Sequence, residues 1–211
     1  MKMNLPNKLT VLRICLVPVI MVVGMLPSSI INFYLSCVVC AILFIGTSVT
    51  DMLDGKIARR DGLITDFGKF LDPVADKFMV IGTLFVILYK AEFANIKTLI
   101  FVTLIIVVFR ELAVTSMRLV VSTGEGIVVA ANSLGKIKTV SQVVAISTVF
   151  LEPVVQLVAK LIYGAITGTT PAWRTDIVPL TWITLVFSLI MAVWSGINYL
   201  KSYWKYLDPE K

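Results

Sequence analysis

Two long uncharged stretches of apolar sequence limit what this chain can fold into. Residues 177–200 and 30–50 contain no Asp, Glu, Lys or Arg. Each reaches the roughly 20 residues that a helix needs to cross the hydrocarbon core of a membrane. Of the 211 residues, 58% are hydrophobic, and the mean hydropathy is +0.93. We therefore predict an all-α integral membrane protein.

Apolar runs and turn signals divide the chain into six predicted transmembrane helices. The spans cover about residues 9–26, 30–60, 65–89, 99–123, 139–160 and 177–200. The first helix is expected to begin at the membrane interface near Pro6, where proline is tolerated in the first turn. Residues 1–211 are expected to form a single transmembrane domain.

Basic residues gather on one side of these predicted spans, the side that both termini share. That side holds Lys2, Lys8, Arg13, Lys56, Arg59, Arg60, Lys69, Lys136, Lys138, Lys201 and Lys205, and the other holds Lys90, Lys97, Lys160 and Arg174. Because cytoplasmic loops carry the excess of Lys and Arg, we predict a multi-pass protein of the cell membrane with cytoplasmic termini. Membrane lipids are its expected surroundings. The sequence shows no basic stripe interleaved with aromatic residues outside the spans, which argues against a nucleic-acid partner.

Four carboxylates are concentrated where the second and third spans meet this face. Asp51 and Asp54 are three residues apart, and Asp72 and Asp76 are four apart, so each pair lies on one face of a helix. Converging carboxylates repel one another and need a counter-charge when buried. The chain has no histidine, and hard carboxylate oxygens favour Mg²⁺, Mn²⁺ or Ca²⁺ over zinc. The spacing therefore predicts a divalent-metal site on the cytoplasmic side.

Small residues accompany the acids at positions where helices usually carry larger side chains. They are Gly55, Ala58 and Gly68. A glycine inside a helix costs about 1 kcal/mol relative to alanine, so some compensating gain is expected. Close approach of a ligand and tight packing of membrane helices both remain open as that gain.

The first helix carries a polar edge formed by Asn7, Thr10 and Arg13, which are spaced by threes and can share one face. This edge could contact a headgroup or a ligand. Alternatively, Arg13 could extend its side chain along the helix to the interface, as long cationic side chains near helix ends commonly do.

Charged residues also interrupt the fourth span and open the fifth. Arg110, Glu111 and Arg118 fall within the fourth, and Lys136 and Lys138 precede or begin the fifth. Charges inside a membrane are costly and usually face a cavity. One acid cannot neutralise two arginines, so these cations, together with Arg59, are expected to hold anionic groups of a ligand.

An acidic metal site bordered by cations suits a lipid-linked diphosphate. Metal ions can neutralise phosphate oxygens and orient an in-line attack, and a further carboxylate can accept the proton of an attacking hydroxyl. A divalent-cation transporter is the alternative from another class, but its acids should lie near the bilayer midplane with a path to both faces. A membrane scaffold would not need four spaced aspartates.

The run D51-x2-D54-G55-x2-A58-R59-x8-G68-x3-D72-x3-D76 resembles the signature of the CDP-alcohol phosphatidyltransferases. The resemblance implies that the predicted domain is catalytic, with the six-helix bundle of that family. It also implies that the four aspartates hold one or two Mg²⁺ or Mn²⁺ ions, that Asp76 is the base, that CMP leaves, and that the protein is a homodimer. The resemblance further implies that the cytidine lies near the small residues Gly55, Ala58 and Gly68. The residues expected to bind the CDP-lipid are Asn7, Thr10, Arg13, Gly55, Ala58, Arg59 and Gly68.

Three further segments are similar to the bacterial branch of this family that joins CDP-diacylglycerol to sn-glycerol 3-phosphate. They are residues 4–13, 109–118 and 135–139. The expected binding site for the acceptor phosphate consists of Arg110, Arg118, Lys136 and Lys138. A serine acceptor would need less cationic charge, whereas an inositol phosphate would need a similar amount. Inositol-phosphate, serine and cardiolipin-type acceptors therefore remain alternatives.

Overall fold

A computed structural model of the chain describes residues 4–60, 62, 65–124, 133–169, 171 and 178–204; at residues 58–59 and 122–124 only the helical backbone is described. The elements are α1 (Leu5–Met25), α2 (Phe33–Arg60), α3 (Asp66–Tyr89), the short 3₁₀ helix η1 (Ala91–Ile96), α4 (Lys97–Gly124), α5 (Ser133–Thr167) and α6 (Pro179–Tyr203). The described residues contain six long helices and no strand. The predicted all-α class is therefore confirmed.

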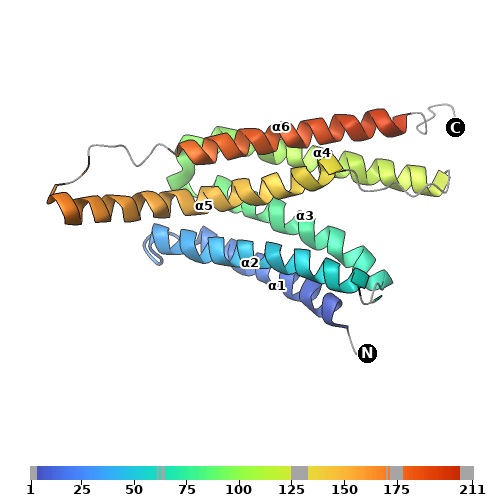
Figure 1. The fold of residues 1–211 in the computed structure, drawn as a ribbon, viewed down its shortest axis with the longest axis horizontal. Coiled ribbons are helices and arrows are strands. Elements are labelled where there is room, and N and C mark those ends of the chain that lie inside the picture. The colour runs from blue at the N-terminus through green and yellow to red at the C-terminus, as the bar shows by residue number, and fades with distance from the viewer. Residues whose placement is uncertain are drawn as a thin grey trace.

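The six long helices lie side by side and alternate in direction along an elongated bundle (Figure 1). Each packs mainly against two others, in the cyclic order α1, α3, α4, α6, α5, α2 and back to α1. The start of α1, the α2–α3 junction and the end of α6 lie at one end of the bundle (Figure 1). We call this the motif end, because Asp51, Asp54, Asp72 and Asp76 lie there, and the opposite end, which contains η1, the far end.

Five helical segments are long and apolar enough to cross a membrane: Leu5–Met25, Phe33–Ile57, Ala91–Val121, Ser133–Thr167 and Pro179–Tyr203. The sixth long helix, α3, has 24 residues but carries Asp72, Asp76 and Lys77 in its first half, and it packs within the same ring. Large apolar side chains such as Ile42 and Ile183 are exposed on the outside of the bundle, as expected for contact with lipid. The protein is an integral membrane protein.

Two side-chain caps fix the starts of the helices that meet at the motif end. The Asn4 side chain accepts a hydrogen bond from the backbone N–H of Asn7 at 3.1 Å, and Thr65 Oγ1 accepts one from the N–H of Gly68 at 3.1 Å. Such caps satisfy donors that the first turn of a helix leaves without partners. α1 and α3 pack against each other, so the two capped first turns lie beside one another.

The apolar core occupies the middle and the far end of the ring. It includes Val17 and Ile20 of α1, Phe44 of α2, Ile87 of α3 and Phe150 of α5, all at most 1% exposed. Burial of side chains of this size contributes about 1.5–3 kcal/mol each. The core holds the helices in register, so that the polar residues of the motif end can meet at fixed distances.

Candidate active site

The polar edge of α1 faces into the bundle. Asn7, Thr10 and Arg13 are 8%, 1% and 1% exposed. Asn7 Oδ1 accepts a hydrogen bond from Thr65 Oγ1 at 3.0 Å. Arg13 is among the largest fully buried side chains of the described chain, so it does not extend along the helix to the interface. The spacing by threes thus places one polar residue per turn on the buried face of α1.

The Arg13 guanidinium lies between three of the four motif carboxylates. Its Nη1 is 2.6 Å from Asp51 Oδ1 and 2.9 Å from Asp76 Oδ1, and its Nη2 is 2.6 Å from Asp54 Oδ2. Asp72 Oδ1 accepts a hydrogen bond of 2.6 Å from Thr10 Oγ1. The two aspartate pairs therefore meet on the polar edge of α1.

The four carboxylates differ in exposure, which separates their possible tasks. The side chain of Asp54 is only 6% exposed, whereas those of Asp51 and Asp76 are 34% and 45% exposed. One guanidinium cannot neutralise several carboxylates, and an uncompensated buried charge is costly. The group retains negative charge on its accessible side, where Asp51 and Asp76 can meet a cation.

Gly68 allows α3 to approach α1 closely. A Cβ atom at this position would lie 3.1 Å from Asn7 Oδ1, 3.3 Å from Thr65 Oγ1 and 3.8 Å from Asp72 Oδ2. The first turn of α3 is thus packed against polar side chains, which is one of the two expected reasons for a small residue. Gly55 is partly buried on α2, and the side chains of Ala58 and Arg59 lie outside the described part of the structure.

A cavity of about 320 Å³ opens beside two of the motif carboxylates, between α3, α4 and α5. Its acidic, basic and amide side chains are Asp72, Asp76, Lys77, Arg110, Glu111, Arg118, Lys138 and Gln142. We call it the charged cavity. It brings together three of the four cations expected to bind the acceptor phosphate.

The fourth expected cation, Lys136, lies elsewhere. It is exposed and lines a separate cavity of about 650 Å³ between α2, α3 and α5. Apart from Asp51, Asp76 and Lys136, the walls of this second cavity are mainly apolar, with residues such as Val49 and Val144. We call it the apolar cavity. Both cavities include Asp76 in their walls, so a ligand that filled both would pass this carboxylate.

The cations of the charged cavity are held by specific partners. Glu111 Oε1 accepts from Arg110 Nη1 at 3.0 Å and also pairs with Lys138 Nζ. Arg118 Nη2 donates to Tyr199 Oη at 2.6 Å. Because one carboxylate is shared between Arg110 and Lys138, the positive charge of the cavity exceeds what Glu111 can neutralise. The site can therefore accept an anion.

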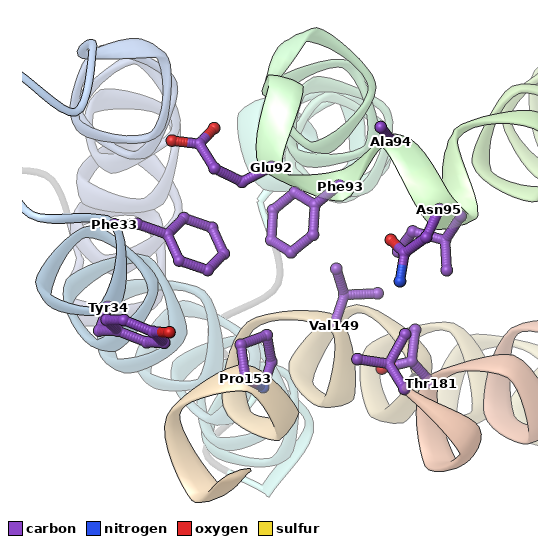
Figure 2. Close-up of a pocket in the computed structure, with 11 residues that line it drawn as sticks. Phe33, Tyr34, Glu92, Phe93, Ala94, Asn95, Val149, Pro153 and Thr181 are labelled. Carbon is purple, nitrogen blue, oxygen red and sulfur yellow. The ribbon is translucent and has the colours of Figure 1, made fainter. Parts of the chain in front are cut away.

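The far end contains a pocket of another kind, about 270 Å³ in volume. Figure 2 shows Phe33 and Phe93 on one side of the pocket and Pro153 and Thr181 on the other. The Glu92 carboxylate points away from Pro153 and Thr181. Its acid, Glu92, pairs with Ser28. Without a facing cation or second acid among its lining residues, this pocket offers no comparable chemistry.

Comparison with known proteins identifies the group to which this arrangement belongs. The sequence model of CDP-alcohol phosphatidyltransferases matches residues 3–194. The chain belongs to this family. The resemblance that the acidic run indicated is therefore confirmed, and the six long helices are consistent with the family fold.

Several bacterial relatives carry the name CDP-diacylglycerol–glycerol-3-phosphate 3-phosphatidyltransferase. One from Bacillus subtilis (strain 168) is 44% identical over 155 residues, covering 70% of this chain and 77% of the relative. One from Yersinia enterocolitica is 33% identical over 215 residues, covering 99% and 100%. One from Rickettsia bellii is 32% identical over 203 residues, covering 96% and 97%.

CDP-alcohol phosphatidyltransferases generally depend on a divalent cation. The four aspartates fit such an ion in donor chemistry, because they offer only hard carboxylate oxygens. Within the described residues, however, no three acidic or cysteine side chains already surround one point as metal ligands. Arg13 lies between them instead. Asp51 and Asp76 are the more accessible of the three carboxylates that contact Arg13, so they would be the first available to an ion.

Sequence reasoning missed several residues of the site. Lys77 and Gln142 line the charged cavity, and Ser195 and Tyr199 of α6 contact the two arginines. Lys77 directly follows Asp76, but adjacent residues do not share a helix face, so their spacing gave no signal that both line one cavity. The pair on α6 shares a helix face at a spacing of four, but serine and tyrosine near a helix end are too common to single out without knowing that α6 packs on α4.

Proposed function

We propose that this chain transfers the phosphatidyl group of CDP-diacylglycerol to sn-glycerol 3-phosphate, giving phosphatidylglycerophosphate and CMP. The observation that carries the proposal is the charged cavity, which places Asp72 and Asp76 with Arg110, Arg118 and Lys138. An attacking alcohol that bears a phosphate needs both a base and a separate anion site. The names of the relatives support the same reaction.

Two cavities sharing Asp76 suit two substrates that react there. The apolar cavity would take the acyl chains of CDP-diacylglycerol, since its walls are mostly apolar. The charged cavity would take glycerol 3-phosphate, whose phosphate would be bound by Arg118, Lys138 and Arg110 through charge-assisted hydrogen bonds. Lys136, which is exposed and lines the apolar cavity, would contact the donor lipid rather than the acceptor.

Asp76 is proposed as the catalytic base. It would take the proton from a primary hydroxyl of glycerol 3-phosphate as the hydroxyl oxygen attacks the phosphorus that bears the diacylglycerol. The bond from this phosphorus to the CMP oxygen breaks, and CMP leaves with the electron pair. No covalent enzyme intermediate is needed, because the two substrates react directly.

A Mg²⁺ or Mn²⁺ ion held by Asp51, Asp54, Asp72 and Asp76 would neutralise the diphosphate and stabilise the leaving CMP. Among these ligands Asp54 is the least accessible. Asn7, Thr10 and Arg13, assigned by resemblance to CDP-lipid binding, would act mainly by positioning carboxylates, since their described contacts are with Thr65 and the aspartates. Direct contact of Gly55, Ala58 and Arg59 with the CDP group remains part of the proposal.

The site is proposed to face the cytoplasm. Lys8, Lys56, Lys69 and Lys201 lie on helix segments at the motif end, and cytoplasmic loops carry the excess of positive charge. The chain is further proposed to act as a homodimer and as one catalytic domain over residues 1–211. Labelling of single cysteines in sealed vesicles tests the orientation, and cross-linking in membranes tests the dimer.

A CMP-release assay on purified protein tests the reaction. CDP-diacylglycerol is supplied with glycerol 3-phosphate, serine, inositol 1-phosphate or no acceptor, in the presence of Mg²⁺, Mn²⁺ or EDTA. We expect release only with a divalent cation and fastest with glycerol 3-phosphate. A preference for serine or inositol 1-phosphate would make the chain another member of the family. Absence of CMP release with every acceptor would reopen the possibility of a cation transporter.

A further inference from the structure

One face of α6 lies directly against the two arginines of the charged cavity. Ser195 and Tyr199 are four residues apart on this helix and are 0% and 2% exposed. Arg110 Nη2 donates to Ser195 Oγ at 2.8 Å, and Arg118 Nη2 donates to Tyr199 Oη at 2.6 Å. Each arginine of α4 thus has its own acceptor on α6, although α6 contributes no residue to the walls of the cavity.

The ring of Tyr199 contacts both guanidinium groups as well. The ring centroid is 5.7 Å from the central carbon of Arg110 and 5.0 Å from that of Arg118, within the roughly 6 Å at which a cation is attracted to an aromatic face. The ring also stacks on that of Tyr203, with the two ring centroids 6.3 Å apart. Gly135 of α5 packs beside the ring: a Cβ atom there would lie 3.5 Å from Tyr199 Oη, an ordinary contact distance.

The chemistry of these contacts preserves the positive charge of the cavity. Two guanidiniums that approach one ring repel each other, and a carboxylate between them would relieve the repulsion by neutralising them. Serine and tyrosine hydroxyls instead accept hydrogen bonds without adding negative charge. The contacts with α6 therefore leave the charge of both arginines unreduced for an entering anion, although Arg110 also pairs with Glu111.

Each arginine also has one hydrogen-bond donor that no described residue engages. The Nε atoms of Arg110 and Arg118 are buried, and neither has a hydrogen-bond partner in the described part of the chain. A buried donor without a partner is destabilising. Both side chains line the charged cavity, so a small shift of either one toward a bound oxyanion would give its Nε–H an acceptor.

We propose that Ser195 and Tyr199 are positioning residues that orient Arg110 and Arg118 toward the phosphate of the acceptor alcohol. The inference rests on the proposed function, since it takes glycerol 3-phosphate as the ligand of the charged cavity. It adds α6, which lies outside the acidic run, to the parts of the fold that decide which acceptor is used.

The test compares Tyr199→Phe, which keeps the ring and removes the hydroxyl, with Ser195→Ala and the double variant. CMP release gives kcat and the KM of each substrate. We expect the KM for glycerol 3-phosphate to rise roughly three- to tenfold in each single variant, as for a weakened hydrogen bond to a charged group, and further in the double variant. The KM for CDP-diacylglycerol and kcat should change less than about twofold, since only acceptor binding is weakened.

Ser202→Ala is the matched control on the same helix. Its hydroxyl is exposed and donates to the carbonyl oxygen of Asn198 within α6, so both KM values should stay at the wild-type level. A competition assay gives a second measurement: inorganic phosphate should inhibit Tyr199→Phe and Ser195→Ala less strongly than the wild type when it competes with glycerol 3-phosphate.

The outcomes separate this inference from the function on which it rests. If wild-type protein releases no CMP in response to glycerol 3-phosphate, the proposed function is wrong. If wild-type protein is active but the variants leave the KM for glycerol 3-phosphate unchanged, or raise both KM values equally, the positioning role is wrong. Should Tyr199→Phe fail to fold, Ser195→Ala with the phosphate competition decides the question.

Discussion

The two ends of the bundle both bury charged side chains, but they compensate them in different ways. At the far end, Lys90 Nζ donates to the carbonyl oxygen of Gly24 in the last turn of α1 and to Ser36 Oγ. Glu152 accepts from the backbone N–H groups of Leu180 and Thr181 in the first turn of α6. Each charge there lies at the helix end of opposite partial charge.

At the motif end, buried charges compensate one another and border on cavities. Arg13 contacts three aspartates, and Glu111 contacts two cations. These groups can exchange partners with a charged ligand, whereas a cation at a helix carbonyl terminus has no such exchange to make. A buried charge satisfied by a helix end therefore indicates a role in stability, and buried charges that face each other beside a cavity indicate a role in binding or chemistry.

Removing the proposed base should have the largest effect. Asp76→Asn keeps the shape of the side chain but cannot accept the proton, and we expect kcat to fall by about 10²–10⁴-fold, the usual contribution of a general base. Binding of CDP-diacylglycerol should remain, which equilibrium binding to the purified variant measures. A variant with a near-wild-type kcat would show that another group takes the proton.

Removing the counter-charge should affect stability and activity together. Arg13→Ala leaves Asp51, Asp54 and Asp76 without their shared cation, and we expect a loss of about 3–5 kcal/mol in the free energy of unfolding. Thermal unfolding in detergent measures it. Lys8→Ala, which removes an exposed cation of the same helix, is the control. Equal unfolding temperatures for the two variants would contradict the central place given to Arg13.

Neutralising one cation of the charged cavity should act on acceptor binding. We expect Arg118→Ala to raise the KM for glycerol 3-phosphate roughly tenfold or more, as for a lost charge-assisted hydrogen bond, and to raise that for CDP-diacylglycerol less. Lys136→Ala, which lies outside this cavity, should leave the acceptor KM near the wild-type value. CMP release with each substrate varied in turn gives both KM values for both variants. A larger rise of the acceptor KM in Lys136→Ala than in Arg118→Ala would exclude the charged cavity as the acceptor site.

A change at the far end should lower stability alone. Glu152→Gln weakens the cap of α6, and we expect a loss of about 1–2 kcal/mol in the free energy of unfolding. The KM values and kcat of the folded variant should stay the same. A change in the KM of only one substrate would show that the far end also affects substrate binding, which contradicts a role in stability alone.

The helical class and the pairing of the aspartates within each helix could be predicted from the sequence. Spacings of three and four place Asp51 with Asp54 and Asp72 with Asp76, whatever the rest of the fold does. The polar edge of α1 could be predicted in the same way. Its partners could not, because the contact of Arg13 with Asp76 joins residues 63 positions apart.

The separation of Lys136 from Lys138 was within reach of the sequence. Lys136 and Lys138 are two residues apart, and side chains at that spacing do not share a helix face. The structure places Lys138 in the charged cavity and Lys136 beside the apolar one. The roles of Ser195 and Tyr199, in contrast, depend on how α6 packs on α4, and the contact of Arg118 with Tyr199 spans 81 positions.

The position of Arg13 has a consequence for how the protein enters its membrane. The cation lies on α1, which is synthesised before α2 and α3, the helices that carry the acids. α2 and α3 can thus insert beside a helix that already offers the opposite charge, which lowers the cost of bringing aspartates to the edge of the hydrocarbon layer. The cation is therefore already in place when the aspartates that it neutralises are synthesised.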